Sequence, residues 1–401
     1  MSKKFTFVEM FVGAGGSHLG FKKQGNFETV LVSDIKKEMC QTFAYNNPEV
    51  KHVLNDDIHN LSGKQIMGMV GMKSGDLDVI FGGVVCKGFS LAGVRSSSDP
   101  RNDLYKKYIS LVKELQPKVA IIENVPGMAS MIIKDGDEFS DDKKKRINEA
   151  WIKLKKLNGL KSSIRKGQAT SEQKAEVHEI EKHKGYYRKL IKEGSMGVID
   201  DIKLLYGKAG YVVIEPQILD ASDYGGATTR RRLIIIAVRK DLDYTKFKFP
   251  PKYTLNPITV GEALKKINYK KHDIDNVPMV HSKKSMMRFS YIPEGKNIVS
   301  VMNKLPKDLR ISEFYSRGCT MRLDRNKPAP TLVPGHSNFP VHPTEDRSTT
   351  VREAAVIMGF PLNYKFFGSH TSRCEQVGQA VVVQMAHALA KATSDFLKEQ
   401  S

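Results

Sequence analysis

Cysteine is scarce in this chain, and its placement excludes several classes of protein. Only four cysteines occur in 401 residues, and they are far apart, at Cys40, Cys86, Cys319 and Cys374. None forms a Cys-x-x-Cys pair or belongs to a cluster with zinc-ligand spacing, so neither a disulfide framework nor a metal site is expected. This usage fits a reducing compartment inside the cell.

Long hydrophobic runs are also missing. No uninterrupted apolar segment approaches the ~20 residues of a membrane-spanning helix. The first residues, MSKKFTFVEMF, lead directly into a strand-like segment and lack the apolar stretch and small-residue cleavage site of a signal peptide. We therefore expect a soluble protein with no membrane partner, in the cytoplasm of a prokaryote or, alternatively, in a nucleus.

Acidic residues are in the minority. The chain has 64 Lys and Arg against 44 Asp and Glu, which gives a net charge of +20 and a pI near 9.5. Hydrophobic residues make up 40% of the chain, enough for a sizeable core, and this excludes general disorder. The excess of positive charge favours a polyanionic partner, and nucleic acid is the first candidate.

The first 245 residues alternate short apolar runs with amphipathic stretches, the rhythm of a parallel sheet covered by helices. Helices are predicted at Ile35–Tyr45 and Leu104–Leu115. The pattern therefore predicts an α/β catalytic domain over residues 1–245. Its predicted strands are Lys4–Phe11, Glu28–Ser33, Val79–Gly82, Val119–Glu123, Gly210–Leu219 and Leu233–Val238.

Two segments depart from this rhythm. From about residue 132 to 193 the chain is rich in Lys and Glu with helical spacing of apolar residues, which predicts a charged helical insertion. We interpret this insertion as a solvated excursion rather than a nucleic-acid-binding arm. Residues 246–370 carry prolines, lysines and isolated strand-like pieces, which predict a smaller, irregular, β-rich domain. Residues 371–401 are expected to return to the first domain, since helical patterns reappear at Thr350–Met358 and Val381–Lys398.

A glycine-rich loop follows the first predicted strand. Gly13–Gly16 opens a helix, where glycines let the backbone approach a ligand and the helix start supplies free N–H groups. Such a loop alone fits many nucleotide cofactors or a plain tight turn. Asp34 ends the second strand, where an acid binds ribose hydroxyls, and Asp57 is placed to accept from an adenine amine. The pattern Gly-x-Gly-x-x-Gly is absent from Gly13–Gly20, GAGGSHLG, which favours a cofactor without a pyrophosphate.

A second glycine-rich loop carries a cysteine. The segment Phe81–Gly93, FGGVVCKGFSLAG, places Cys86 just after a strand, where open α/β sheets bind their ligands. The neighbouring Lys87 favours the nucleophilic thiolate. A lone cysteine is more often an inert core residue, but the flanking glycines argue against a packed strand interior. The next strand presents Glu123 at the same sheet edge, either as a functional acid or as a helix cap.

Together these elements resemble the DNA (cytosine-5) methyltransferase family. The matching segments occur in family order and cover most of the chain, so chance is a poor explanation for them. They are Phe11–Gly16, Gly82–Gly93, Asp99–Tyr105, Glu123–Gly127, Leu219–Gly225 leading to Arg230–Arg232, Pro328–Leu332, Arg347–Pro361 and Gln376–Val381.

The resemblance implies a fold, a cofactor and a set of binding residues. The sheet would be the Rossmann-like sheet of S-adenosylmethionine-dependent methyltransferases, and residues 246–370 would be the target-recognition domain. Phe11 would pack on the adenine of S-adenosylmethionine, Asp34 would bind its ribose, and Asp57 with Ile58 would hold the adenine edge. The full implied cofactor set is Phe11, Gly13, Ala14, Gly15, Gly16, Asp34, Ile35, Asp57, Ile58 and Gln379.

The resemblance also implies a reaction on duplex DNA. A cytosine flipped out of the helix would be attacked at C6 by Cys86, and Glu123 would bind or protonate its N3. Arg232, supported by Arg230, would bind the cytosine O2 and stabilise developing negative charge. The implied DNA contacts are Lys87, Ser90 and Thr331. A sequence-specific restriction-modification context, a cognate restriction endonuclease and a monomeric enzyme are the corresponding expectations.

Three motifs depart from the family pattern. Val84-Val85-Cys86-Lys87 stands where Pro-Pro-Cys-Gln is usual, and Ala227-Thr228 replace a Pro-Gln. Gly378–Val383 reads Gly-Gln-Ala-Val-Val-Val instead of Gly-Asn-Ala-Val-Pro-Pro. Proline fixes φ and removes an N–H, so valines are expected to loosen these turns. The longer Gln379 side chain is expected to alter the fit of the cofactor.

Three functions remain open on this reading. An active DNA cytosine-5 methyltransferase keeps every ionisable group at its motif position, as this chain does. A binding module would keep the fold and lose methyl transfer through the valine substitutions. An RNA cytosine-5 methyltransferase would suit a shorter variable region than the hundred or so residues found after Lys246. The first of the three is therefore preferred.

Overall fold

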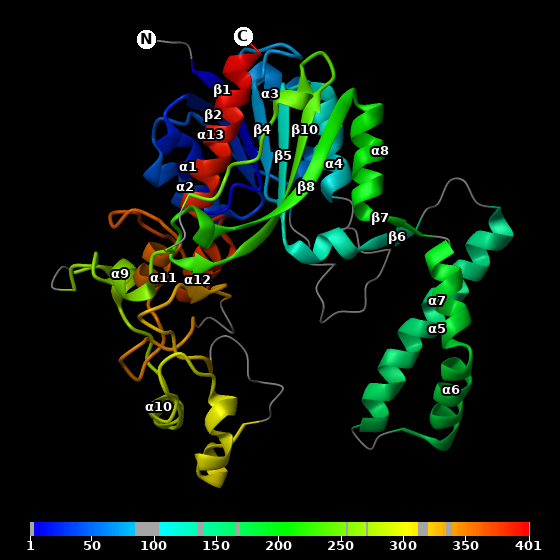
Figure 1. Ribbon diagram of the computed structural model, residues 1–401, viewed down its shortest axis with the longest axis vertical. Helices are drawn as coiled ribbons and strands as arrows, with labels where there is room; N and C mark the ends of the chain where they lie inside the picture. The colour runs from blue at the N-terminus through cyan, green and yellow to red at the C-terminus, as the bar shows by residue number, and fades with distance from the viewer. Residues whose placement is uncertain are drawn as a thin grey trace.

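The computed structural model shows a sheet-based body with two extensions below it (Figure 1). The residues that the structure describes are 4–84, 104–134, 140–165, 169–193, 195–253, 256–269, 272–311, 320–333 and 339–400. One extension is the lobe, residues 246–370. The other is the arm, residues 140–193. Both extend from the same side of the body (Figure 1).

The body is built on a seven-stranded sheet of order β3-β2-β1-β4-β5-β10-β8. Within it, β10 is antiparallel to both neighbours, whereas β3, β2, β1, β4 and β5 pair in parallel. The predicted α/β fold is confirmed, and each predicted strand of the body is present with its ends shifted by two residues or fewer. The strands are β1 (Phe5–Met10), β2 (Phe27–Asp34), β3 (His52–Asn55), β4 (Val79–Gly82), β5 (Val119–Asn124), β8 (Tyr211–Asp220) and β10 (Arg231–Arg239).

Helices cover both faces of the sheet (Figure 1). Successive side chains of a strand point to opposite faces, so Phe7 joins one apolar core and Val8 the other. The two cores are the reason that the sheet strands read as nearly continuous apolar runs. One face carries α1 (Gly16–Gln24), α2 (Lys37–Asn46) and α13 (Val383–Glu399), and the other carries α3 (Gly63–Val70), α4 (Leu104–Leu115) and α8 (Val198–Lys208).

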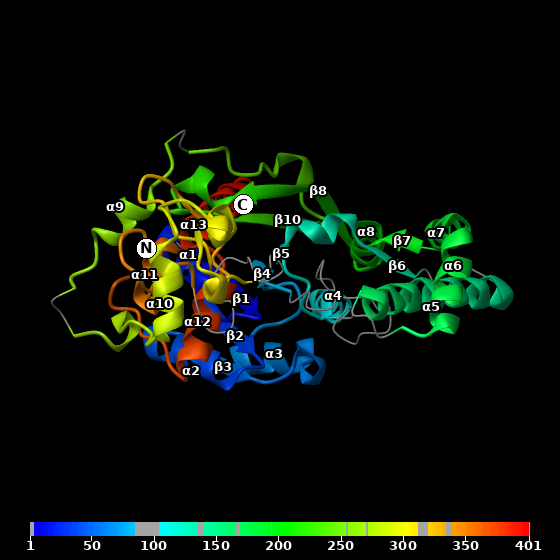
Figure 2. The ribbon, with the colours of Figure 1, turned by 90° about the horizontal axis from the view of Figure 1, so that it is seen from below.

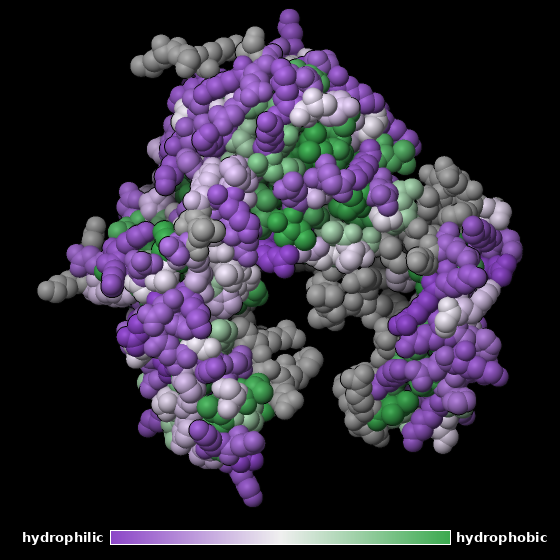
Figure 3. Space-filling model, in the orientation of Figure 1, coloured by the Kyte–Doolittle hydropathy of each residue, from purple (hydrophilic) through white to green (hydrophobic). Residues whose placement is uncertain are grey.

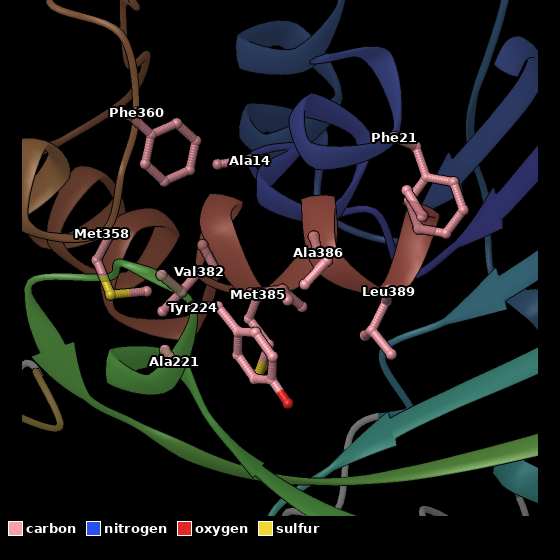
Figure 4. Close-up of a cluster of buried hydrophobic side chains, with 14 of the residues drawn as sticks. Ala14, Phe21, Ala221, Tyr224, Met358, Phe360, Val382, Met385, Ala386 and Leu389 are labelled. Carbon is pink, nitrogen blue, oxygen red and sulfur yellow. The ribbon is translucent and has the colours of Figure 1, made fainter. Parts of the chain in front are cut away.

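The C-terminal helix α13 packs tightly against α1. Gly20 permits this approach, because a Cβ at that position would overlap Ala386 of α13. Figure 4 shows α13 crossing the middle of the core, with Phe21 of α1 on one side and Tyr224 on the other. The last 30 or so residues of the chain therefore complete the core beneath the glycine loop.

The prediction of a β-rich lobe is wrong for the residues that the structure describes there. Apart from the two-residue strand β11, strand pairing in the lobe is limited to isolated bridges. Asp273, Ser282 and Asn297 each accept a hydrogen bond from a backbone N–H two or three residues ahead, which favours turns and helix starts over strands. The described elements are α9 (Val260–Leu264), α10 (Lys283–Ser290), β11 (Ala329–Pro330), α11 (Val351–Ile357) and 3-10 turns at Ile274–Asn276, Ile298–Lys304 and Lys307–Leu309, and a further 3-10 turn at Tyr244–Lys246 leads into the lobe.

A buried arginine holds the lower part of the lobe together. Arg322 donates hydrogen bonds to the carbonyl oxygens of Phe289, Ile292, His342 and Glu345 at 2.7–2.9 Å. Its guanidinium also pairs with Asp346 at 2.6 Å. These bonds satisfy carbonyls that a sheet would otherwise pair, around a small apolar cluster that includes Phe289. Side-chain donors thus replace strand ladders here.

The arm is helical and joins the body through a short ribbon. The antiparallel strands β6 (Ile132–Lys134) and β7 (Ser195–Gly197) form this ribbon, so the first residues of the predicted insertion are strand rather than helix. Beyond it lie α5 (Asp141–Arg165), α6 (Ser171–Lys182) and α7 (Lys184–Glu193). The view from below shows these helices standing apart from the lobe (Figure 2).

Candidate active site

A cavity of about 430 Å³ opens at the carboxyl ends of β1 and β2. Its size is typical of a site for a cofactor-sized ligand. Six residues that the sequence predicted for cofactor binding line it, namely Phe11, Asp34, Ile35, Asp57, Ile58 and Gln379. The other lining residues, which sequence reasoning missed, are Met10, Ser33, Lys36, Met39, Asp56, His59 and Leu104. Most of these neighbour a predicted residue in sequence, which is the signal that could have found them.

Asp34 ties the two loops of the cavity together. One carboxylate oxygen accepts the backbone N–H of Gly13 at 2.9 Å, and the other accepts that of Lys36 at 2.9 Å. Burial raises the pKa of Asp34, and these backbone bonds oppose that effect. Each carboxylate oxygen has a second lone pair, so the side chain can still accept a ligand hydroxyl.

The glycine loop shapes the cavity from behind. Gly13, Ala14, Gly15 and Gly16 do not line it, in contrast to the expectation that they contact the cofactor directly. A Cβ at Gly16 would overlap the Val381 carbonyl oxygen, and the Ala14 carbonyl accepts the Tyr364 hydroxyl at 2.5 Å. The loop is thus set by close packing against the C-terminal part of the chain.

Phe11 occupies a strained backbone conformation. Its φ is +58°, a left-handed value that costs energy for any side chain other than glycine. The turn takes the chain out of β1, so that Phe11 lines the cavity and the next residue, Val12, is buried. Such strain persists only where surrounding contacts fix it, which supports a binding role for this position.

Asp57 and His59 form a pair at the cavity wall. One carboxylate oxygen of Asp57 accepts the backbone N–H of His59 at 2.9 Å and lies 2.8 Å from its Nδ1. These bonds lower the pKa of Asp57. The pair orients the Asp57 carboxylate while leaving a carboxylate oxygen outside both contacts.

Gln379 stands at the rim, at the end of α12 (His370–Gln379). Its amide donates a hydrogen bond to Glu375 at 2.7 Å. Glu375 in turn forms an ion pair with Lys36 at 2.6 Å. The residue that departs from the family pattern is therefore linked to the loop after β2.

Glu123 and Arg232 lie side by side at the sheet edge. Glu123 is near the end of β5, and Arg232 is near the start of the adjacent antiparallel strand β10. The Arg232 Nε lies 2.7 Å from a Glu123 carboxylate oxygen, and both side chains are about 10% exposed. The antiparallel pairing brings together an acid and a base that are 109 residues apart in sequence.

Arg230 lies behind this pair, fully buried. Burial, with some repulsion from Arg232, lowers its pKa to about 9. Its Nε has no hydrogen-bond partner among the described residues. Arg230 therefore adds positive potential to the site without being neutralised by a direct ion pair to Glu123.

The cavity and the Glu123–Arg232 pair, the two parts of the site, both border Gly83. A Cβ built on Gly83 would lie 3.7 Å from the Phe11 carbonyl oxygen and 3.9 Å from a Glu123 carboxylate oxygen. Asn124 donates a hydrogen bond to the Val84 carbonyl at 3.0 Å. Cys86, Lys87 and Ser90 lie outside the described residues. The last described residues before Cys86 are thus held between the cavity and Glu123.

Thr331 is placed beside the arginine strand. Its hydroxyl donates to the Thr229 carbonyl at 3.2 Å, next to the parallel pairing of β11 with β9 (Thr228–Thr229). This pairing joins the lobe to the segment that leads into Arg230. In the part of the chain that the structure describes, no metal-binding group of His, Cys, Asp or Glu occurs and no helix could span a membrane.

The fold and the site define an α/β enzyme with a ligand cavity beside a buried acid–arginine pair. The chain belongs to the C-5 cytosine-specific DNA methylase family, whose model matches residues 5–136 and 187–395. It is a DNA cytosine-5 methyltransferase, as the sequence resemblance predicted.

Individual relatives agree with this assignment. The chain is 30% identical to Type II methyltransferase M.PspPI of Psychrobacter sp. (strain TA137), over 98% of this chain and 79% of the relative. It is 27% identical to Type II methyltransferase M.Eco47II of Escherichia coli, with the same coverage. Among solved structures, one described as a DNA modification methyltransferase of an E. coli prophage shares the fold at a TM-score of 0.65 and 23% identity, over 98% of this chain and all of that chain.

Proposed function

We propose that the enzyme transfers a methyl group from S-adenosylmethionine to C5 of a cytosine flipped out of duplex DNA, through a covalent Cys86–C6 adduct. The observation that carries this proposal is the Glu123–Arg232 pair, which borders Gly83 together with the cavity wall. A base seated there meets an acid, an arginine and the loop that leads to Cys86.

The cavity fits an adenosine-type cofactor. Asp34 offers acceptors for ribose hydroxyls, and Asp57, oriented by His59, offers an acceptor for an adenine amine. Phe11 and Ile58 supply apolar walls, and Gln379 with Lys36 supplies polar groups at the rim. When bound, S-adenosylmethionine supplies an electrophilic methyl group on a sulfonium. The absence of a phosphate-binding glycine pattern agrees with a cofactor that has no pyrophosphate.

The protein activates the base by making C5 electron-rich. The Cys86 thiolate adds to C6, and the electron pair of the C5–C6 double bond moves toward C5 and the N3–O2 side of the ring. Glu123 holds or donates a proton at N3, and Arg232 stabilises the charge at O2. C5 would then form a bond to the methyl carbon as the bond from that carbon to the sulfonium sulfur breaks, which leaves S-adenosylhomocysteine. Loss of the C5 proton to a base in solvent restores the double bond and expels Cys86.

Arg230 supports this chemistry indirectly, through its effect on Arg232 and Glu123. Its buried charge lies near both Arg232 and Glu123, and at neutral pH a pKa of about 9 leaves it mostly protonated. A second cation behind Arg232 strengthens the positive potential where the ring charge develops. Arg230 is thus a positioning residue.

Val84, the last described residue before the nucleophile loop, is anchored to the body. Val84 is buried, and its carbonyl is held by the Asn124 amide at 3.0 Å. Asn124 itself is buried and follows Glu123 directly. This anchored approach to Cys86 supports an active enzyme over a binding module.

The restriction-modification context rests on relatives that are named Type II methyltransferases. By this analogy the DNA target is a defined sequence, read by the lobe and by Thr331, and a cognate restriction endonuclease recognises the same sequence. A monomer in the cytoplasm is the simplest form for this role. Lys87 and Ser90 complete the proposed DNA contacts.

The test is transfer of tritium from labelled S-adenosylmethionine, with duplex DNA and RNA substrates in parallel. Wild type is expected to label DNA cytosine, and Cys86→Ala to label nothing while still binding the cofactor. Sequencing of the product then gives the target site. Label in RNA alone would replace the DNA proposal. No label in either nucleic acid, despite cofactor binding, would leave the binding module as the better account.

A further inference from the structure

The arm is the part of this chain that its family does not explain. The family model matches up to residue 136 and resumes at 187, so the whole of α5 and α6 falls between the matched stretches. The family model therefore does not account for the arm. Its sequence carries sixteen Lys and Arg against eight Asp and Glu over residues 140–193.

The arm is a folded unit rather than a loose excursion. Ile147 and Ala150 of α5 pack against Leu190 and Ile191 of α7, with Trp151 beside them. Ion pairs between α5 and α6 join Lys156 to Glu176 and Lys161 to Glu181. The β6–β7 ribbon fixes both ends of the arm to the body. A packed core, cross-helix ion pairs and a two-stranded attachment are more than a solvated excursion needs.

Other basic side chains of the arm form hydrogen bonds to tyrosines and make no close ion pair among the described residues. Arg146 donates to the Tyr186 hydroxyl at 2.7 Å, and Lys153 donates to the Tyr187 hydroxyl at 3.1 Å. Lys153 also lies 5.2 Å from the centre of the Tyr187 ring. The two tyrosine rings are 5.7 Å apart, and Arg188 follows them on α7, exposed to solvent. The tyrosines hold the cations in place without neutralising them.

The arm also stands in the right place for a long ligand. Figure 3 shows an open hollow between the arm and the lobe, below the body. The carboxyl ends of β4 and β5, which lead to Cys86 and carry Glu123, point toward this hollow (Figure 1). With 25 residues, α5 is about 37 Å long, close to one turn of B-DNA at about 34–36 Å.

We infer that the arm is a second DNA-binding wall, in which Arg146, Lys153 and Arg188 contact the phosphate backbone of the duplex beside the target site. The inference rests on the proposed function, because it assumes that duplex DNA enters the hollow. Phosphate contacts by cations are insensitive to sequence and fix the position of the duplex. The arm therefore contributes affinity and register, while the choice of target is made elsewhere.

The experiment measures how DNA affinity depends on salt. A fluorescein-labelled 40-base-pair duplex is titrated by anisotropy with S-adenosylhomocysteine present, from 50 to 300 mM salt. The arm variant is R146Q/K153Q/R188Q. Each lost phosphate contact reduces the magnitude of the slope of log K against log salt by about one unit. The slope of the variant is therefore expected to be about three units shallower than that of wild type. Its methyl transfer at saturating DNA is expected to match wild type.

Two matched variants isolate the effect. The variant R146K/K153R/R188K keeps the charges and is expected to keep the wild-type slope. The variant K73Q/K113Q/K208Q removes three exposed lysines that precede β4, β5 and β8, at the sheet edge opposite the cavity. It is expected to leave the slope within one unit of wild type. Far-ultraviolet circular dichroism checks that the helices of the arm variant are intact.

The possible failures are distinguishable. If wild type itself binds no duplex, the proposed function fails. If wild type binds duplex and the arm variant keeps its slope, the inference about the arm fails alone. If the arm variant instead changes the sedimentation coefficient of the free protein at an unchanged slope, the surface binds protein, and the inference is likewise overturned.

Discussion

Two buried glutamates, Glu9 in the body and Glu353 in the lobe, are accommodated in opposite ways. In the body, Glu9 of β1 is fully buried beside Ser17, and its second carboxylate oxygen has no partner among the described residues. Burial raises the pKa of Glu9 to about 8. In the lobe, Glu353 of α11 is equally buried, yet it accepts two hydrogen bonds from Arg347 at 2.8–2.9 Å. Although burial raises the pKa of Glu353, the bonds from Arg347 outweigh it, and the net shift is downward.

This difference follows from how each region is built. The body pairs its backbone groups in a sheet and fills both faces with apolar side chains, so Glu9, buried among them, keeps its proton at neutral pH. The lobe has few strand pairs among its described residues, and arginines such as Arg322 satisfy its carbonyls instead. The lobe shares the apolar core of the body through residues such as Val351 and Phe366, and adds ionic and side-chain hydrogen bonds in place of sheet pairing.

The largest expected effect is at Arg322. Replacing it with Ala leaves several buried carbonyls and Asp346 without their donor, which is expected to cost about 3–5 kcal/mol of the free energy of unfolding of the lobe. Limited proteolysis and thermal unfolding measure the loss. The control is Arg325→Ala, whose solvent-exposed pair with Glu294 is expected to contribute far less to stability. Equal losses in the two variants would refute the special role of Arg322.

The next largest effect is on the pH dependence of the free energy of unfolding, to which Glu9 and Glu353 are expected to contribute with opposite sign. Glu9 keeps its proton in the folded protein up to about pH 8 but loses it near 4.5 when unfolded, so its contribution to stability falls as pH rises through this window. The slope approaches about 1.4 kcal/mol per pH unit. Denaturant unfolding at pH 5 and pH 8 is expected to show a smaller fall for Glu9→Gln than for wild type, and no such change for the exposed Glu28→Gln.

Glu353 is expected to behave the other way. Its lowered pKa means that the Arg347 pair stabilises the protein above the ordinary pKa of Glu and is lost as pH falls through the lowered value. Glu353→Gln should therefore reduce stability at pH 7 and have its effect diminished in acid. If Glu9→Gln and Glu353→Gln shifted the pH dependence in the same direction, the contrast between body and lobe would be wrong.

A smaller effect is expected where α1 meets α13. Gly20→Ala places a Cβ against Ala386, and the resulting overlap is expected to cost about 1–3 kcal/mol. Gly68 offers the matched control, because it lies in α3 with no atom near its would-be Cβ. Gly68→Ala is expected to raise stability by up to about 1 kcal/mol. Chemical denaturation of both variants reports the difference, and a neutral Gly20→Ala would show that the contact is not tight.

The smallest effect concerns the cavity itself. His59→Ala removes the ring contact that orients Asp57 but leaves the backbone hydrogen bond, so affinity for S-adenosylhomocysteine is expected to fall only a few-fold. Asp57→Ala is expected to reduce affinity more. Isothermal titration compares the two. A loss for His59→Ala as large as that for Asp57→Ala would mean that the ring contacts the ligand directly.

Much of the body could be predicted from the sequence because local and global signals agree there. Val79–Gly82 and Leu104–Leu115 are apolar or amphipathic runs bounded by loops, and the structure has those elements at those residues. The short edge strand β3 gave no such run and was missed. The lobe was predicted wrongly as β-rich, since the bonds of Arg322 to distant carbonyls leave no trace in local sequence patterns.

The position of the cavity was predictable because its acidic residues follow strands in sequence. The packing around the cavity was not predictable from local sequence. Asp34 and Asp57 stand at loops after strands, where a ligand site is expected, and both line the cavity. The glycine loop was expected to touch the cofactor, yet Gly16 meets the Val381 carbonyl, a contact across 365 residues. The partnership of Glu123 with Arg232 likewise depends on the register of β5 with β10, which sequence periodicity does not reveal.

The central claim is that Cys86 forms a covalent bond to the target cytosine. The direct measurement uses duplex DNA in which 5-fluorocytosine replaces cytosine, incubated with the enzyme and S-adenosylmethionine and analysed on a denaturing gel. Fluorine at C5 cannot leave as a proton does, so the adduct is expected to persist as a protein–DNA band, and peptide mapping to place the bond at Cys86. A wild-type enzyme that methylates ordinary DNA but gives no such band, or a band of equal strength from Cys86→Ala, would contradict the account.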